Sequence, residues 1–279
     1  MLVLADNNPI RHISRPWVNH TLIALCVVFF LFDPGWQTYG FTPADLQRVA
    51  WPGAAAKPGD GLPALQMVSY IFLHADLLHL AGNMLALWVF GNNVEDSMGH
   101  LRYALFFILC GIAGALGEGL FSAVPEVPVI GASGAIAGVM GAYLLLHPRA
   151  RVLVLIAFRF PVLVPASVFV GVAVAVDLVS ALLPDPEAEM LVAWWAHIGG
   201  FAAGALLILV MRYRDVPLFQ PAAIYPEQGF GRLGRFLLDL GPRQDATSAR
   251  AGRLRQLWAG VKAVTFFLII VIVVETFFP

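Results

Sequence analysis

Seven long apolar stretches constrain the fold of this chain more than any other feature of its sequence. A helix needs about 20 residues to cross a hydrocarbon core ~30 Å thick. Only 13% of the residues are charged, against about 25% in a typical soluble domain. So few charges cannot cover a water-facing surface, and the apolar surface must therefore face lipid. The stretches lie at 17–33, 68–92, 101–122, 133–147, 161–183, 190–211 and 259–278.

These stretches predict an all-α polytopic membrane protein with a six-helix core and a seventh, C-terminal transmembrane helix. The core spans 17–212 and follows an N-terminal tail, 1–16. A long loop, 34–66, separates the first two spans. An Arg-rich linker, 213–257, leads to the seventh helix at 258–279.

The basic residues predict the orientation of the chain. The loops on the N-terminal side hold almost all of the arginines, whereas the opposite side holds only Arg48 and Lys57, both in the long loop. Cytoplasmic loops carry such an excess of Lys and Arg. We therefore expect a multi-pass protein of the cell's inner (plasma) membrane, with the N-terminus cytoplasmic and the C-terminus extracytoplasmic. A net charge of −1 gives no basic field for nucleic acid, and the lipid bilayer is the expected environment.

Polar and ionisable residues inside membrane spans are costly and mark candidate functional sites. Four places stand out. They are His74, His79 and Asn83 in the second, Ser133 between Gly131 and Gly134 at the start of the fourth, Asp177 in the fifth and His197 in the sixth. The two cysteines, Cys26 and Cys110, lie in apolar runs and are expected to be buried thiols.

Ser133 and His197 are predicted to lie at the same depth. Each lies about 15 residues from the basic residues that mark the inner end of its span. At 1.5 Å per residue, both lie ~22 Å above the inner boundary and thus roughly 8 Å below the outer surface.

Small residues at four-residue spacing predict that the two helices carrying Ser133 and His197 pack closely. Such ridges let helix backbones approach each other in lipid. Ser133 and His197 each lie one residue away from a ridge, so close packing would bring hydroxyl and imidazole within hydrogen-bond reach. The ridges are Gly134, Gly138 and Ala142 on one helix, and Ala196, Gly200 and Gly204 on the other.

A serine hydroxyl next to a histidine has the chemistry of a nucleophile and its base. Acyl transfer also needs hydrogen-bond donors for the developing oxyanion. The N–H of Ser133, at a helix start, is one candidate donor. His79 and Asn83 are one helical turn apart and are candidate side-chain donors, while Gly131 lets a substrate carbonyl approach the backbone.

Two further polar residues, His74 and Asp177, lie near these candidates in the sequence pattern. His74 is 140° from His79 on a helix, so the two do not share a face, and we expect His74 at the water boundary, ordering the loop or water near the site. Asp177 lies near the height of His197 and either orients it as a third member, as carboxylates do in soluble triads, or lines a water pocket; we favour the pocket. Zinc proteases show H-E-x-x-H; no such string occurs, so no metal site and no cofactor are expected.

At these residues the chain resembles the rhomboid intramembrane serine proteases. The resemblance covers roughly 17–212 and rests on three motifs in order. They are H-x4-H-x3-N (His74, His79, Asn83), G-x-S-G (Gly131 to Gly134) and A-H-x-x-G-x-x-x-G (Ala196 to Gly204). It implies a rhomboid-like core with Ser133 as nucleophile, His197 as base, and His79, Asn83 and the Ser133 N–H as the oxyanion hole.

The resemblance also implies several structural roles. Glu95 would tie helices together, the loop 34–66 would lie in the outer leaflet, and the fifth span would act as a lateral gate. Gly134, Gly138, Gly200 and Gly204 are expected to be structural. The partners would be transmembrane protein substrates, cleaved near the outer leaflet.

Two positions depart from the family's pattern. Leu65-Gln66 replaces the Trp-Arg pair that many members carry in the first loop. Ala137 stands where some members have a tyrosine under the catalytic histidine, so the imidazole must be held differently. Two other classes of function compete: a non-catalytic relative that binds and routes membrane proteins, which typically lacks the reacting pair, and a transporter, for which inverted repeats are expected and none is evident.

Overall fold

The computed structural model describes residues 2–6, 8–32, 35–50, 63–156, 160–183 and 192–222. They form two compact units. The smaller contains 2–6, 151–156 and 160–164, and the larger, which is helical, contains the described residues of Pro9–Ala150 and Pro165–Ala222. The predicted seventh helix and most of the predicted linker lie outside the described residues.

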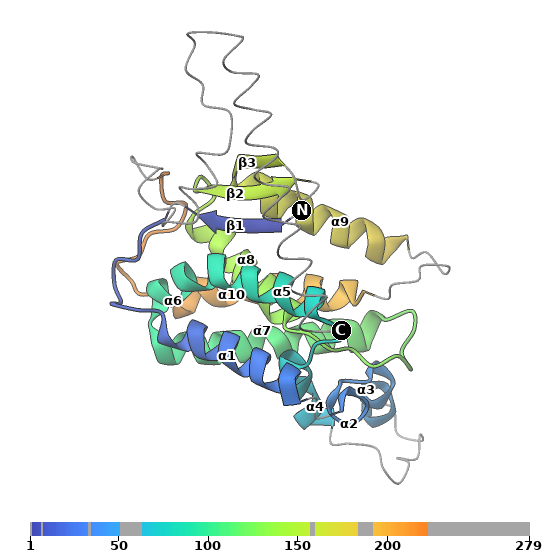
Figure 1. Ribbon diagram of the computed structural model, residues 1–279. Helices are drawn as coiled ribbons and strands as arrows, with labels where there is room; N and C mark the ends of the chain where they lie inside the picture. Colours follow the sequence, from blue (N-terminus) through green and yellow to red (C-terminus); the bar gives the residue numbers. More distant parts are fainter. Residues whose placement is uncertain are drawn as a thin grey trace, which may run out of the picture. The chain divides into compact units, whose positions relative to one another are not determined.

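The larger unit consists of short and long helices (Figure 1). In chain order they are α1 (Trp17–Phe32), α2 (Trp36–Tyr39), α3 (Pro43–Ala50), α4 (Pro63–Ser69), the 3₁₀ helix η1 (Tyr70–Phe72), α5 (Leu77–Ala86), the π-helix η2 (Leu87–Gly91), α6 (Asn92–Met98), α7 (His100–Phe121), α8 (Ser133–Leu146), α9 (Ala166–Leu182) and α10 (Trp194–Met211).

The smaller unit is a three-stranded sheet, which differs from the all-helical expectation. Its strands β1 (Leu2–Asp6), β2 (Arg151–Ile156) and β3 (Phe160–Pro165) are arranged in the order β1-β2-β3, with β1 antiparallel to β2. Val3, Val152 and Val154 are buried, and β-branched side chains suit a pleated, half-buried surface. The start of the predicted tail is therefore paired as a strand.

Two of the helices are long and apolar enough to cross a membrane by themselves, namely α7 and α10. A third span results if the segments 64–72 and 77–98, which meet at a bend of 92°, are counted as one. The shorter apolar helices α1, α8 and α9 coincide with three other predicted spans. The described residues therefore form a mostly helical protein with several membrane-compatible helices.

The second predicted span is not one straight helix. The chain leaves helical geometry after η1, and α5 begins only at Leu77, where the Asp76 carboxylate accepts a hydrogen bond of 2.8 Å from the backbone N–H of His79. A carboxylate in this position satisfies one of the unpaired N–H groups at a helix start. The prediction that placed His74 on the same helix as His79 was wrong, because Asp76 begins a new helix between them.

Helices α8 and α10 pack backbone to backbone, as the small-residue spacing predicts. A β-carbon on Gly200 would overlap the carbonyl oxygen of Gly134, and one on Gly204 would overlap that of Gly138. Larger residues would hold the helices apart. Glycine at these positions is therefore what allows the close approach.

Glu95 connects helices, as the family resemblance implies. It is fully buried, and its carboxylate accepts hydrogen bonds from the backbone N–H groups of Val18 (3.1 Å) and Asn19 (2.8 Å) at the start of α1. It also contacts the ring of His100. The carboxylate thus satisfies first-turn N–H groups of α1 and ties α1 to α6 and α7.

Candidate active site

Ser133 is the first residue of α8 and follows a tight turn. Gly131 in this turn has a φ of +122°, a conformation that favours glycine. The N–H of Gly131 donates to the carbonyl of Tyr70 at 2.9 Å, which fixes the turn against η1. Because a helix leaves its first N–H groups without intrahelical partners, the Ser133 N–H is a free donor by geometry.

His197 lies in the first turn of α10, and Glu118 of α7 holds the start of this helix. The Glu118 carboxylate, 6% exposed, accepts a hydrogen bond of 3.1 Å from the N–H of Ala196. We did not predict a role for Glu118. It is nevertheless a carboxylate inside an apolar stretch, so the rule that singled out Asp177 would also have found it.

The hydroxyl of Ser133 and the imidazole of His197 are in contact. Oγ lies 2.9 Å from Nε2, an ordinary hydrogen-bond distance. The matching depth and the glycine ridges predict this contact from sequence. The arrangement allows Nε2 to accept the hydroxyl proton, which is the first step in activating a serine.

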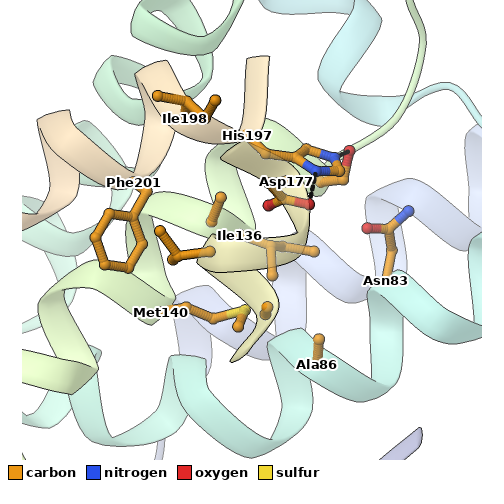
Figure 2. A pocket seen from close by; sticks show the side chains of 12 residues that line it. Asn83, Ala86, Ile136, Met140, Asp177, His197, Ile198 and Phe201 are labelled. Carbon is orange, nitrogen blue, oxygen red and sulfur yellow. Dashed lines mark hydrogen bonds and ion pairs between the residues drawn. The ribbon is translucent and has the colours of Figure 1, made fainter. Parts of the chain in front are cut away.

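Asp177 reaches the other nitrogen of the same ring. Its Oδ1 lies 3.4 Å from His197 Nδ1, and the two side chains are 20% and 17% exposed. Figure 2 shows the carboxylate on α9 pointing toward the imidazole. We favoured a water-lining place for Asp177, and the structure places it against the ring as well as in the cavity wall.

Beside these residues lies a cavity of about 240 Å³. Its wall is largely apolar, with Asn83, Asp177 and His197 (Figure 2) and Ser133 as polar lining residues. Such a mixture can hold a short apolar side chain next to a reacting peptide bond. The lining residues are Asn83 and Ala86 of α5, Ser133, Ile136, Ala137 and Met140 of α8, Ala173, Val174 and Asp177 of α9, and His197, Ile198 and Phe201 of α10.

His79 lies against the turn that precedes Ser133, and Asn83 lines the same cavity as Ser133. A β-carbon on Gly131 would come within 2.7 Å of His79 Nε2 and 3.8 Å of Ser133 Oγ, so the ring lies directly against the turn. The Asn83 amide donates to the His79 carbonyl at 3.1 Å, which uses one of its two N–H protons. The structure thus brings both predicted donors to the serine.

His74 lies behind His79, in the break between η1 and α5. The two rings are 5.1 Å apart, edge to face. His74 is only 8% exposed, and neither ring nitrogen has a hydrogen-bond partner among the described residues. We expected His74 at the water boundary; in the structure its ring is buried next to that of His79.

Metal binding needs several ligands converging on one point. In the part of the chain that the structure describes, no three His, Cys, Asp or Glu side chains are grouped in this way. Cys26 and Cys110 are free and buried, as expected.

Comparisons with known proteins identify the family of the chain. Residues 63–214, more than half of the chain, match the model of the Rhomboid domain. The chain belongs to the rhomboid family and is a membrane protein.

Individual relatives are similar over the same region. The chain is 31% identical to RHOMBOID-like protein 1 of Arabidopsis thaliana over 149 residues (53% of this chain, 35% of the relative). It is 31% identical to the mitochondrial Rhomboid protein 1 of Saccharomyces cerevisiae over 146 residues (51% and 40%). It is 42% identical to Rhomboid protease GluP of Bacillus subtilis over 79 residues (28% and 15%). In each case the chain spans less than half of the relative's length.

Proposed function

We propose that this chain is an intramembrane serine endopeptidase that cleaves transmembrane segments of membrane proteins. The observation that carries the proposal is the 2.9 Å contact between Ser133 Oγ and His197 Nε2 at the wall of a cavity. A non-catalytic relative that only binds and routes membrane proteins has no need of such a pair. Membership of the rhomboid family and similarity to a protein named a rhomboid protease support the same activity.

In the proposed reaction, His197 acts as the general base and Ser133 as the nucleophile. Nε2 takes the proton from the hydroxyl while Oγ attacks the substrate carbonyl carbon. The resulting imidazolium donates this proton to the leaving amine, and an acyl-enzyme remains on Oγ. Water, deprotonated by His197, then hydrolyses the ester and releases Ser133.

The negative charge on the carbonyl oxygen is held by His79, Asn83 and the Ser133 N–H. Each preorganised donor of this kind contributes roughly 3 kcal/mol to the transition state. The backbone N–H of Ala75 lies 3.5 Å from His79 Nδ1. Because an N–H needs an acceptor, Nδ1 is the unprotonated nitrogen and Nε2 carries the proton toward the turn at Gly131.

The proposed substrates are transmembrane helices with a weak or unwound stretch near the outer leaflet. A peptide bond inside a stable helix is shielded by its neighbours, so helix-breaking residues and small side chains are expected near the cut. We place the protein in the inner (plasma) membrane of the cell, with Ser133 toward the extracytoplasmic side. The proposed reaction uses no cofactor.

The test is labelling with a fluorophosphonate probe followed by peptide mapping. Full-length protein in liposomes should be labelled on the peptide that contains Ser133, and it should cleave a reporter transmembrane helix. The Ser133→Ala protein, verified as folded by its circular dichroism spectrum, should show neither labelling nor cleavage. Labelling at another residue, or cleavage by Ser133→Ala, would contradict the proposal.

A further inference from the structure

We propose that Asp177 is a positioning residue for His197, so that the site works as a Ser-His-Asp triad. The inference rests on the function proposed above and deepens it. Its carboxylate fixes the rotation of the imidazole and keeps the proton on Nδ1. The lone pair of Nε2 then faces the Ser133 hydroxyl.

The geometry of the three side chains supports a triad. Three helices each contribute one side chain to a line of contacts: Ser133 from α8, His197 from α10 and Asp177 from α9. The distances are 2.9 Å on the Nε2 side and 3.4 Å on the Nδ1 side. The second distance is long for a hydrogen bond, but such bonds tighten when substrate closes an active site.

The tautomer of His197 that Asp177 favours is the one that a base for Ser133 needs. An ionised carboxylate can only accept hydrogen bonds, so the nitrogen that faces Asp177 carries the proton. Neutral imidazole has one protonated nitrogen, which leaves the lone pair on Nε2. Ser133 has a hydroxyl proton to donate, and only this tautomer can receive it.

The side chain at position 137 leaves space under the imidazole ring of His197. Ala137, one turn after Ser133, lines the cavity with its single methyl group, so no large side chain from this position braces the imidazole. The edge of Trp194 approaches the ring with centroids 6.0 Å apart, which limits movement on one side only. A contact at Nδ1, together with that of Ser133 at Nε2, restrains the rotation of the ring.

The carboxylate of Asp177 is energetically unfavourable in its apolar surroundings unless it has a partner. Asp177 is the one charged residue in α9, whose remaining side chains are almost all apolar. A charge inside an apolar, membrane-compatible helix is unfavourable unless it has a partner or water. The ring of His197 is that partner, and an imidazolium formed during the reaction would be stabilised by the adjacent negative charge.

The experiment compares kcat and KM of reporter cleavage in liposomes for three variants of the full chain. Asp177→Asn should lower kcat about 10²-fold, a typical cost of misplacing a catalytic group, with KM little changed, because the cavity keeps its shape. Asp177→Glu should recover part of this loss, because a carboxylate remains within reach of the ring. The matched control is Asp215→Asn, the same chemical change at a side chain that is 77% exposed and not part of the cavity wall.

Chemical rescue separates positioning from packing. Asp177→Ala leaves room beside the cavity, and added formate should raise its kcat in a saturable manner by supplying a carboxylate to Nδ1. Formate should not change the wild-type protein. Wild-type kcat in Asp177→Asn would overturn the inference, as would equal losses in Asn, Glu and Ala proteins that formate does not relieve.

The proposed function fails separately. If Ser133→Ala cleaves the reporter as fast as wild type, the chain is not a serine protease of this kind. If Ser133→Ala is inactive while Asp177→Asn retains full kcat, only the triad is wrong and the Ser-His pair acts alone.

Discussion

Helices α8 and α10 pack more tightly against each other than α9 packs against these two helices. The interface between α8 and α10 is glycine against backbone, where a β-carbon at Gly200 or Gly204 would overlap a carbonyl oxygen of the other helix. In α9, only Ala166 and Val170, near its start, are buried, and every residue from Gly171 to Leu182 is at least partly exposed. A β-carbon at Gly171 would meet nothing within 4 Å.

The difference separates two tasks within one site. Ser133 and His197 lie on the tight interface, where small displacements are opposed by close-packed backbone. Asp177 lies on the loosely packed half of α9, which also lines the cavity. If α9 moves to admit a substrate, the contact between Ser133 and His197 therefore need not change. The same movement changes the contact of Asp177 with the ring of His197.

The largest effect is expected from removing the two side chains at the tight interface. Ser133→Ala and His197→Ala should each abolish cleavage of a reporter helix in liposomes, a loss of about 10⁴-fold or more, since the residues act as a unit. The double variant should be no worse than either single variant. Both proteins should keep the helical content and thermal transition of wild type, and additive losses in the double variant would show that the two residues do not act together.

Asn83→Ala tests the cavity wall formed by α5. Loss of one oxyanion donor should lower kcat by about 10²- to 10³-fold and leave measurable activity. A larger loss, equal to that of Ser133→Ala, would mean that α5 carries a reacting group and not a supporting donor. The control for a change of α5 itself is Ala86→Gly. Ala86 lines the same cavity but has no polar group.

Gly200→Ala and Gly171→Ala compare the two regions directly with one added methyl group each. In Gly200→Ala the methyl group meets the Gly134 carbonyl, and overpacking of this kind costs about 1–3 kcal/mol. In Gly171→Ala the methyl group enters open space, so stability should be unchanged or raised slightly through helix propensity. Unfolding in mixed detergent micelles and reporter cleavage measure both effects, and equal sensitivity at the two glycines would refute the contrast.

The smallest effect is expected from metal removal. A metal bound between His197 and Asp177 would join the two regions in place of a direct contact. We expect EDTA to leave the rate of reporter cleavage unchanged, because the proposed chemistry uses only side chains and backbone N–H groups. Loss of activity that zinc restores would require a metal-dependent mechanism.

Sequence alone determined the class of protein and the order of the motifs, and it predicted a common depth for Ser133 and His197. Depth can be read from a sequence because a helix rises 1.5 Å per residue regardless of its neighbours. The lateral approach of α8 and α10 was also predictable, since glycines at four-residue spacing mark faces that pack closely. These properties are local, and so the contact of Ser133 with His197 could be inferred before the structure.

Only the tertiary structure decided the features that depend on how distant segments meet. The direction of Asp177 around α9, the burial of His74 and the support of α10 by Glu118 all depend on the rotation of one helix against another, which residue spacing within one helix does not specify. The pairing of Leu2–Asp6 with Arg151–Ile156 likewise joins segments far apart in the chain. The break before Leu77 was predictable only in part. The capping carboxylate of Asp76 marks it in the sequence, but the apolar residues on both sides of it hide the signal.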